Sequence, residues 1–306
     1  MKENTMWVEA FRPKTLDGYI GNEQLIEKVK IFIESGDVPH LLFYGPAGTG
    51  KTTLAKIIAN NIDADFMYIN ASSENSVDTV RDKISRYAAT VGWGKNGKII
   101  VLDEADFMTP NGQAALRNVM EQFSAGCRFI LTCNYVEKII DPIQSRCQVF
   151  GITPPDKPTV AKRLITILQA KGIEFTPVDV ATIINNSYPD VRRAINQTQG
   201  SIIDGKLVVS KASTIQANYM TELLHILTSK GNPKSNFTNI RQIIADSKVR
   251  DFQPLYEFLY EKVDEYAEGH VAQIILIIAE AQFMDVSVVD KEINVMAMFV
   301  KILGEL

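Results

Sequence analysis

The segment from Gly45 to Thr52 restricts the folds open to this 306-residue chain more than any other. Its sequence, GPAGTGKT, fits the pattern G-x-x-x-x-G-K-[ST] and lies between an apolar run, LLFY, and a helical pattern, TLAKIIAN. A glycine-rich turn in that place points backbone N–H groups at a phosphate chain, and the start of the helix adds a partial positive charge. Lys51 would reach the β- and γ-phosphates, and the Thr52 hydroxyl would bind Mg²⁺. The segment therefore predicts a nucleotide site on a strand–loop–helix unit.

The first half of the chain alternates short apolar runs with helical patterns. We expect strands at 41–44, 66–70, 99–102, 129–133 and 148–150, and helices at 24–35, 52–60, 77–89 and 113–123. Strands that alternate with helices indicate an α/β fold whose parallel sheet is covered by helices on both faces. The runs IIVLD and RFILTCN are largely apolar, as expected of buried central strands.

A proline-rich break, TPPDKP at 153–158, ends this alternation, and strand signals stop after it. Helices are expected at 160–170, from Pro177 onward and at 190–199, and helical spacing of apolar residues continues from about residue 218 to the end. The chain is thus predicted to hold three domains. They are an α/β domain over 1–152, a small helical lid over 153–217 and a helical domain over 218–306.

Acidic residues end the strand expected at 99–102. Asp103 and Glu104 follow it at the carboxyl edge of the sheet, where open parallel sheets bind their ligands. Asp103 would hold Mg²⁺, and Glu104 would polarise the water that attacks the γ-phosphate. Asp106, in the same DEAD run, is either a further site residue or a solvated charge or helix cap.

Three further polar residues are candidates for contacts with the γ-phosphate. Asn134 follows the strand at 129–133 and would hydrogen-bond the phosphate or the attacking water, unless it is only a turn residue. Arg146 could stabilise phosphoryl charge in a neighbouring subunit, or form a surface salt bridge. Arg192, near the start of a lid helix, could reach the phosphates if the lid folds over the nucleotide. Its alternative is a charged solvent-facing position.

Composition excludes several classes of protein. Lys plus Arg is 32 and Asp plus Glu is 36, so the net charge is −4, which argues against a wholly basic nucleic-acid binder. Any such site must be a local basic patch or must use backbone amides. Apolar runs stay well short of the ~20 residues that span a bilayer, and the N-terminus has no apolar signal region. Three cysteines without C-x-x-C spacing and three scattered histidines argue against disulfides and a zinc site. We therefore expect a cytoplasmic protein.

Seven segments occur in one order that resembles a known family. They are WVEAFRP at 7–13, PHLLFY at 39–44, NAS at 70–72, DEAD at 103–106, QAALR at 113–117, SRC at 145–147 and DVRR at 190–193. The chain resembles the AAA+ sliding-clamp loader ATPases of the replication factor C small-subunit type. The resemblance covers residues 7–193, and the helical content beyond is similar to the collar of that family.

The resemblance implies a role for each matching position. Adenine would be held by Val8, Glu9, Ala10, Phe11, Arg12 and Ile20, and the phosphates by Gly48, Thr49, Gly50, Lys51, Thr52 and Thr53. Arg146 would act on the ATP of the neighbouring subunit, and Arg192 on the ATP of its own. Members of the family form a five-membered spiral around primer–template DNA through the collar. ATP binding lets them open a ring-shaped clamp, and DNA triggers hydrolysis.

A finer resemblance is to the large, ATP-hydrolysing subunit of T4-type bacteriophage clamp loaders, which implies the host cytoplasm. It rests on the short chain, on the compact segment between Arg81 and Lys98, and on Tyr188-Pro189-Asp190, where cellular members usually have Gly-Asp. Ala47 and Ser73 depart from the usual family residues. The second departure puts any DNA contact at that position in doubt.

Two other functions stay open. Another AAA+ motor, such as a branch-migration helicase or a protein remodeller, would need pore loops or a winged-helix C-terminus. A non-hydrolysing scaffold subunit would have a broken P-loop or lack the glutamate of DEAD. If the chain is a clamp loader, its contact with the clamp would come from the end of the helix expected at 77–89, through Tyr87, Val91 or Trp93. Otherwise this cluster is part of the core.

Overall fold

The computed structural model describes residues 6–74, 77–92, 94–209, 211–229, 231–247, 249 and 251–306, without the side chains of 79–81 and 211–218. The chain divides into two compact units, Met1–Leu207 and Val208–Leu306. The three domains expected from the sequence, with boundaries after residues 152 and 217, stay a prediction. Residue 217 lies inside helix α10 (Lys211–Thr228).

The first unit is built on a five-stranded parallel sheet in the order β2-β3-β4-β1-β5. Its strands are β1 (Leu41–Tyr44), β2 (Asp65–Asn70), β3 (Lys98–Asp103), β4 (Cys127–Cys133) and β5 (Gln148–Gly151). All five strands lie where the sequence predicts them, within two residues at each end. The predicted α/β fold class is confirmed, and β3 is buried along its whole length, as a central strand of a parallel sheet should be.

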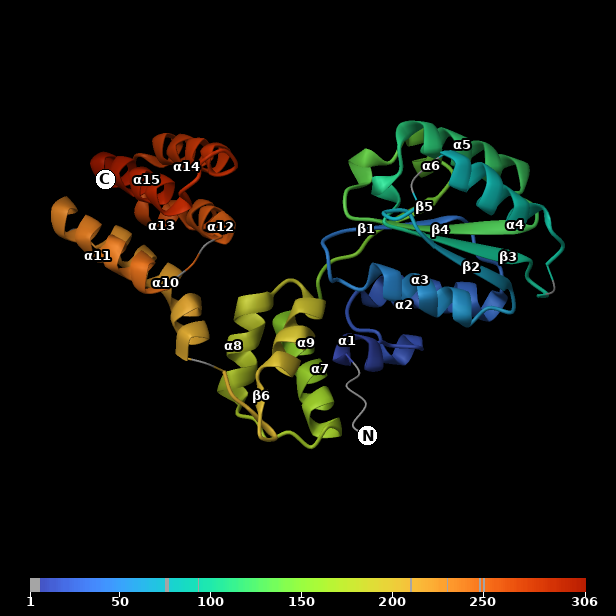
Figure 1. Ribbon diagram of the computed structural model, residues 1–306, viewed down its shortest axis with the longest axis horizontal. Helices are drawn as coiled ribbons and strands as arrows, with labels where there is room; N and C mark the ends of the chain where they lie inside the picture. The colour runs from blue at the N-terminus through green and yellow to red at the C-terminus, as the bar shows by residue number, and fades with distance from the viewer. Residues whose placement is uncertain are drawn as a thin grey trace. The chain divides into compact units, whose positions relative to one another are not determined.

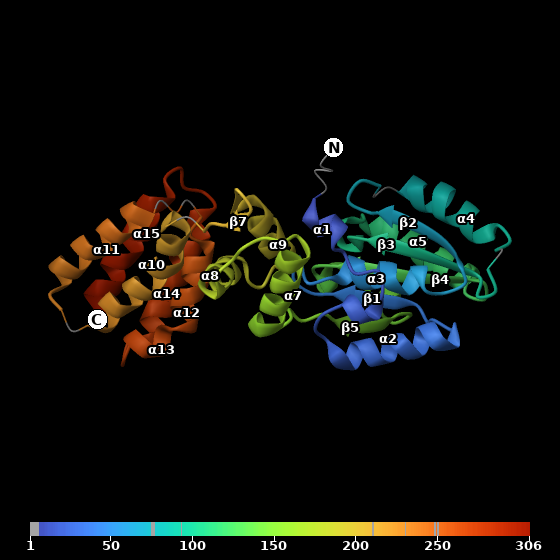
Figure 2. The same ribbon diagram turned by 90° about the horizontal axis from the view of Figure 1, so that it is seen from below.

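Helices cover both faces of this sheet (Figures 1 and 2). On one face, α2 (Glu23–Ser35) and α3 (Lys51–Asn60) pack residues such as Val29 and Leu54 against Phe43 and Val101. On the other face, α4 (Ser85–Ala89), α5 (Pro110–Gln122) and α6 (Asp141–Gln144) pack against Leu42, Ile100 and Phe129. Because alternate residues of each strand face opposite sides, one sheet supplies two cores.

Three helices follow the sheet in the same unit: α7 (Lys157–Ala170), α8 (Pro177–Ser187) and α9 (Val191–Gly200). The side chains of Asp156, Thr176 and Asp190 each accept a hydrogen bond from the backbone N–H three residues on, so each helix begins with a side-chain cap. Proline in the first turn of α7 and α8 fixes the backbone there. The predicted cap at Thr176 is confirmed and α9 begins within one residue of its predicted start, whereas α7 begins three residues before the predicted residue 160.

The expectation that strands end after residue 152 is wrong in one place. Ile202–Ile203 (β6) and Lys206–Leu207 (β7) form an antiparallel hairpin around Asp204 and Gly205, which both have positive φ. Asp-Gly is a strong signal for such a two-residue turn. The two strands were missed because two residues are too few to show alternation.

The predicted helix at 77–89 is also not continuous. A π-helical stretch, η2 (Thr79–Ile84), precedes a short α4. A π-turn adds one residue to each hydrogen-bonded ring, so the face presented by the helix rotates at that point. Apolar spacing alone does not reveal such a local widening.

The second unit consists of helices joined by short connections and has no strand among the residues that the structure describes. Its helices are α10, α11 (Pro233–Ser247), α12 (Gln253–Glu261), α13 (Val263–Tyr266), α14 (Val271–Asp285) and α15 (Lys291–Glu305). Residues such as Leu223, Ile240, Leu255 and Phe299 form its core. Over the described residues, none of the helices is long and apolar enough to cross a membrane.

Lys98, the first residue of β3, is only 2% exposed. Its Nζ donates to the carbonyl oxygen of Tyr87 at 2.6 Å, to Oγ1 of Thr90 at 2.6 Å and to the carbonyl oxygen of Thr90. It also lies 5.0 Å from the centroid of the Tyr87 ring. The last carbonyls of a helix have no partner within the helix. The Lys98 ammonium therefore closes the end of α4 and ties it to the sheet.

Replacing Lys98 by Met keeps most of the apolar stem and removes the three donated bonds. We expect the free energy of unfolding to fall by about 1–3 kcal/mol, because the partly buried carbonyl oxygens of Tyr87 and Thr90 lose a charged donor. Urea unfolding followed by circular dichroism measures this. The control is Lys95→Met, at an exposed lysine nearby, which should change stability by less than about 0.5 kcal/mol. Equal stabilities of the two variants would contradict the assigned role.

Candidate nucleotide-binding site

The loop between β1 and α3 has a backbone that only glycine allows at several positions. Gly45, Gly48 and Gly50 all have positive φ, at 143°, 73° and 100°. A Cβ at Gly45 would collide with the carbonyl oxygen of Ile152, and one at Gly48 with the carboxylate of Asp190. The second approach brings the loop against Asp190, the N-cap of α9, so α9 begins in contact with this loop.

Lys51 lies under this loop and is 8% exposed. Its Nζ donates to the carbonyl oxygens of Gly45 and Pro46, both at 2.8 Å. Burial lowers the pKa of Lys51. The ammonium group is thus held by carbonyl oxygens of the same loop whose N–H groups would bind a phosphate.

Three hydroxyl groups converge on the carboxylate of Asp103, which is 6% exposed. Thr52 and Thr132 donate to its Oδ1 at 2.7 and 2.5 Å. The hydroxyl of Tyr68 donates to Oδ2 at 2.6 Å. Burial, followed by the hydrogen bond to Asp103, raises the pKa of Tyr68, so its hydroxyl keeps its proton.

The pair Thr52 and Asp103 fits Mg²⁺. A hydroxyl and a carboxylate are the hard oxygen ligands that this ion prefers, and a nucleotide-bound Mg²⁺ takes only one or two ligands from the protein. Within the described part of the chain, no group of three or more His, Cys, Asp or Glu residues is arranged to hold a metal ion. An ion at this place would therefore depend on phosphate oxygens for the rest of its shell.

Glu104 sits next to this carboxylate in a left-handed backbone conformation, with φ of 57°. Its backbone N–H donates to Oγ1 of Thr132 at 3.1 Å. A non-glycine residue with positive φ is uncommon and is typical of functional sites. At Glu104 the backbone therefore turns out of the extended conformation in which β3 ends at Asp103.

Asp106 joins two loops at the edge of the sheet. Its Oδ2 accepts hydrogen bonds from the backbone N–H groups of Asn134 and Tyr135, at 3.2 and 3.4 Å. Its Oδ1 is buried and has no hydrogen-bond partner among the described residues. Asp106 is therefore neither a solvated charge nor a helix cap: it fixes the backbone of Asn134, and so the position of that side chain.

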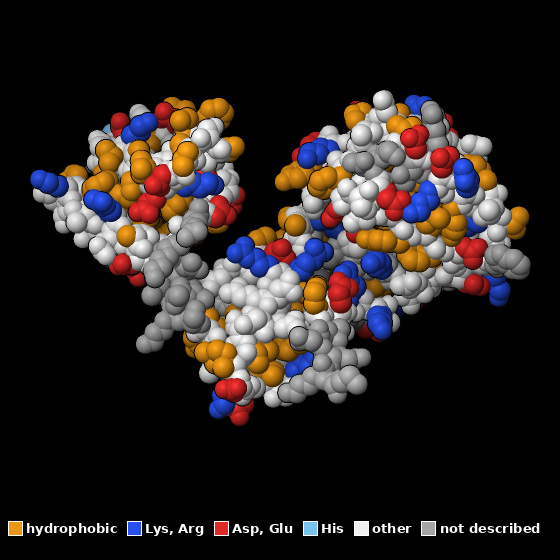
Figure 3. Space-filling view, viewed as in Figure 1, with side chains coloured by type: hydrophobic (Ala, Val, Ile, Leu, Met, Phe, Trp, Pro, Cys, Tyr) orange, Lys and Arg blue, Asp and Glu red, His pale blue; other side chains and the backbone are white. Residues whose placement is uncertain are grey.

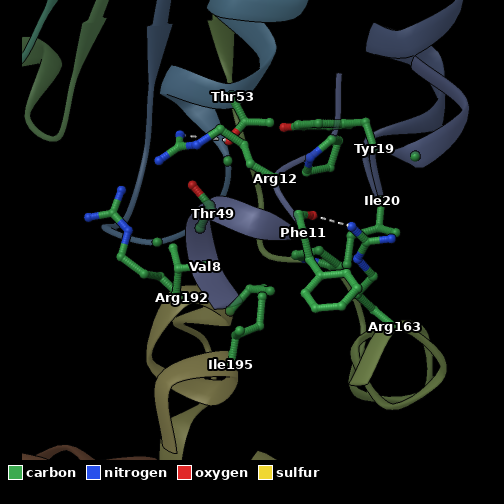
Figure 4. Close-up of a pocket in the computed structure, with 16 residues that line it drawn as sticks. Val8, Phe11, Arg12, Tyr19, Ile20, Thr49, Thr53, Arg163, Arg192 and Ile195 are labelled. Atoms are coloured by element: carbon green, nitrogen blue, oxygen red, sulfur yellow. Dashed lines mark hydrogen bonds between the residues drawn. The ribbon is translucent and has the colours of Figure 1, made fainter. Parts of the chain in front are cut away.

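A cavity lies between the N-terminal segment, the loop after β1 and the helices α7 and α9 (Figure 4). The structure brings nine of the predicted residues together on its wall: Val8, Phe11, Arg12, Ile20, Gly48, Thr49, Gly50, Thr53 and Arg192. Arg12 is held by Glu9, at 3.1 Å between Nε and Oε2, and donates to Oγ1 of Thr53 at 3.3 Å. The hydrogen bond from Arg12 to Glu9 is the main cause of the lowered pKa of Glu9. Glu9 and Ala10 are themselves exposed and do not line the cavity.

Arg163 on α7 also lines this cavity, and the sequence did not reveal it. Its Nη2 donates to the carbonyl oxygen of Phe11 at 2.5 Å. In the same region, the backbone N–H of Trp7 donates to Oε1 of Gln199 on α9 at 2.8 Å. Helices α7 and α9 thus hold the two ends of the short helix α1 (Trp7–Ala10). An arginine within a helical pattern carries no signal for such a contact.

Arg146 is not on the wall of the cavity. It donates to the carbonyl oxygen of Pro142 at 2.7 Å and forms an ion pair with Glu121 of α5, and its side chain is 35% exposed. The surface salt bridge that the sequence leaves open is therefore present. A role toward a neighbouring subunit stays a prediction.

Comparison with known proteins gives three informative matches. The family model of ATPases associated with various cellular activities (AAA) matches residues 41–154. The replication factor C small subunit of Archaeoglobus fulgidus is 41% identical over 256 residues, which cover 80% of this chain and 78% of that protein. Replication factor C small subunit 1 of Pyrobaculum arsenaticum is 32% identical over 312 residues, covering 97% and 93%.

Solved structures share the fold at much lower identity. The Holliday junction branch migration motor RuvB of Thermotoga maritima has a TM-score of 0.55 and 17% identity, and the match covers 85% of this chain and 81% of that one. At that identity the likeness concerns the fold alone, which supports the α/β ATPase architecture.

Replacing Arg163 by Ala tests how far the lid holds the cavity wall. We expect ATP affinity to fall by about tenfold, or roughly 1.4 kcal/mol, because Phe11 loses a charged donor on its carbonyl oxygen. Titration with a fluorescent ATP analogue measures the dissociation constant. The matched control is Lys162→Ala, an exposed position next in the same helix. If both variants bind ATP as the parent does, Arg163 does not shape the cavity.

Proposed function

Because this chain belongs to the replication factor C small-subunit family, we propose that it is an ATP-hydrolysing subunit of a clamp loader in DNA replication. It would bind and hydrolyse ATP in order to open a sliding clamp and load it on primer–template DNA. The observation that carries this proposal is the edge of the sheet. There Lys51, Thr52 and Asp103 lie together, with Glu104 directly after Asp103.

Each residue of the site has a chemical task in this proposal. The cavity wall holds the adenine, and the N–H groups of 48–53 with Lys51 bind the phosphates. Thr52 and Asp103 would hold Mg²⁺, which supplies positive charge to the phosphates. Glu104 would orient the attacking water, and Asn134 would hydrogen-bond the water or the γ-phosphate. Arg192, which lines the cavity from the lid, would pair with phosphate charge.

The partners follow from the family. They are the sliding clamp, primer–template DNA and further clamp-loader subunits, in a homo- or hetero-oligomer with five members. Residues 218–306 would form the collar that joins them, beyond an ATPase domain at 1–152 and a lid at 153–217. In the second unit, α14 and α15 expose Leu276, Phe283, Ile293 and Val300 at 55–78%, and Figure 3 shows hydrophobic side chains on that surface. Such exposure supports burial against another chain.

The surface toward the clamp would be the end of α4 and the segment after it. Val91 is 89% exposed there, whereas Tyr87 packs partly against the core and its hydroxyl is buried. Trp93, which the sequence also suggests, lies outside the described residues. Val91 is therefore the best-supported contact of the three.

Two finer assignments stay predictions. The likeness to T4-type bacteriophage clamp loaders finds no support in the archaeal relatives named above, and a cytoplasmic location rests on the sequence alone. Of the alternatives, a non-hydrolysing scaffold is disfavoured by the intact loop and by Glu104. The helical second unit disfavours a motor with a winged-helix end.

Replacing Glu104 by Gln should leave ATP binding intact and slow hydrolysis by at least about 100-fold, because the neutral amide cannot orient and polarise the attacking water as a carboxylate does. Single-turnover hydrolysis and filter binding, measured on the assembled complex, separate the two effects. Glu137→Gln, at an exposed position after β4, is the control and should hydrolyse at the parental rate. Near-normal turnover in Glu104→Gln would remove this residue from the water-orienting role.

Arg146→Ala should spare ATP binding and lower hydrolysis in the assembly by about 10³-fold, because the guanidinium would serve the neighbour's site. Arg117→Ala, at the other arginine beside Glu121, is the matched control. Mixing Arg146→Ala with Lys51→Ala subunits should restore part of the activity at mixed interfaces. Absence of any recovery would mean that Arg146 acts on its own chain or only in folding.

A further inference from the structure

Tyr68 occupies an unusual place for a residue that touches the site. It lies on β2, an edge strand of the sheet, and is 36% exposed. Its ring has Lys56 of α3 on one face, with Nζ 4.4 Å from the ring centroid. Its hydroxyl nevertheless reaches the buried Asp103 carboxylate, 2.6 Å from Oδ2.

The two oxygens of that carboxylate have different neighbours. Oδ1 faces Thr52, the predicted partner in holding Mg²⁺, and also accepts from Thr132. Oδ2 has the Tyr68 hydroxyl. Two bonds on one oxygen and one on the other fix the carboxylate against rotation about its own axis. Oδ1 is thereby held on the side of Thr52, where the ion is expected.

We propose that Tyr68 is a positioning residue for Mg²⁺–ATP, which sets the orientation of the Asp103 carboxylate through its hydroxyl. The inference rests on the proposed ATPase function of the same site. Groups that hydrogen-bond a metal ligand from behind orient that ligand and tune its affinity. Tyr68 occupies that place relative to Asp103, while Lys56 holds its ring from the helix that carries Thr52.

The packing around Tyr68 separates this role from a structural one. Its neighbour Met67 packs against the core of the sheet, whereas the Tyr68 ring stays at the exposed edge. Phenylalanine at this position keeps the ring, the strand and the contact with Lys56. Only the hydroxyl is lost, so a change in metal dependence is expected without a large loss of stability.

The test is Tyr68→Phe in the full chain, with ATP binding titrated by fluorescence in EDTA and then over a series of Mg²⁺ concentrations. We expect equal ATP affinity in EDTA for the variant and the parent. The Mg²⁺ concentration for half-maximal enhancement should rise about tenfold in the variant. An unchanged Mg²⁺ midpoint, or an equal loss of affinity in EDTA, would overturn the proposal.

Two further variants sharpen the result. Tyr256→Phe removes the same kind of bond, a tyrosine hydroxyl 3.1 Å from the buried Asp285 carboxylate, in the second unit. It should leave the Mg²⁺ midpoint unchanged, and an equal shift there would overturn the assignment.

Adding Tyr68→Phe to Asp103→Asn should cause no further shift, because the carboxylate that Tyr68 orients is gone. An additive shift would also overturn the assignment. If the parent chain itself shows no Mg²⁺-dependent ATP binding, the proposed function fails instead.

Discussion

A buried carboxylate that must face an anion is the constraint on which the rest of the first unit depends. Asp103 is 6% exposed and lies where phosphate is expected, so its charge needs donors around it. Those donors come from α3, β2 and β4, as Thr52, Tyr68 and Thr132. The order β2-β3-β4 places two of them beside Asp103, and the loop after β1 brings the third. The order of the strands therefore decides which donors can reach Asp103.

Much of this frame could be predicted because its signals are local. A P-loop between an apolar run and a helical pattern, and a strand that ends in Asp103 and Glu104, fix the neighbours of the site without any knowledge of register. Tyr68 could not be found in this way. It lies opposite Val101 in the β2–β3 register and still reaches Asp103 two residues further on. That contact depends on the length and direction of one side chain, which periodicity does not encode.

The wrong predictions have physical causes of the same kind. The π-helical stretch Thr79–Ile84 changes the helical period over one turn, and the strands around Asp204 and Gly205 are shorter than any window that detects alternation. Lys98 follows a polar turn and begins a strand, so its sequence context gives no hint that it closes the end of α4. Each of these features is set by a few backbone dihedral angles or one buried amine, not by a repeated pattern.

The nucleotide cavity depends on the lid as much as on the sheet. Arg163 holds the carbonyl of Phe11, Gln199 holds the backbone of Trp7, and Gly48 lies against Asp190. At the start of the linker to the lid, the side chain of Asn22 makes three hydrogen bonds to Thr153, at 2.9–3.0 Å. A ligand in the cavity would touch α7 and α9 as well as the loop after β1, so its binding would favour the arrangement in which these contacts form.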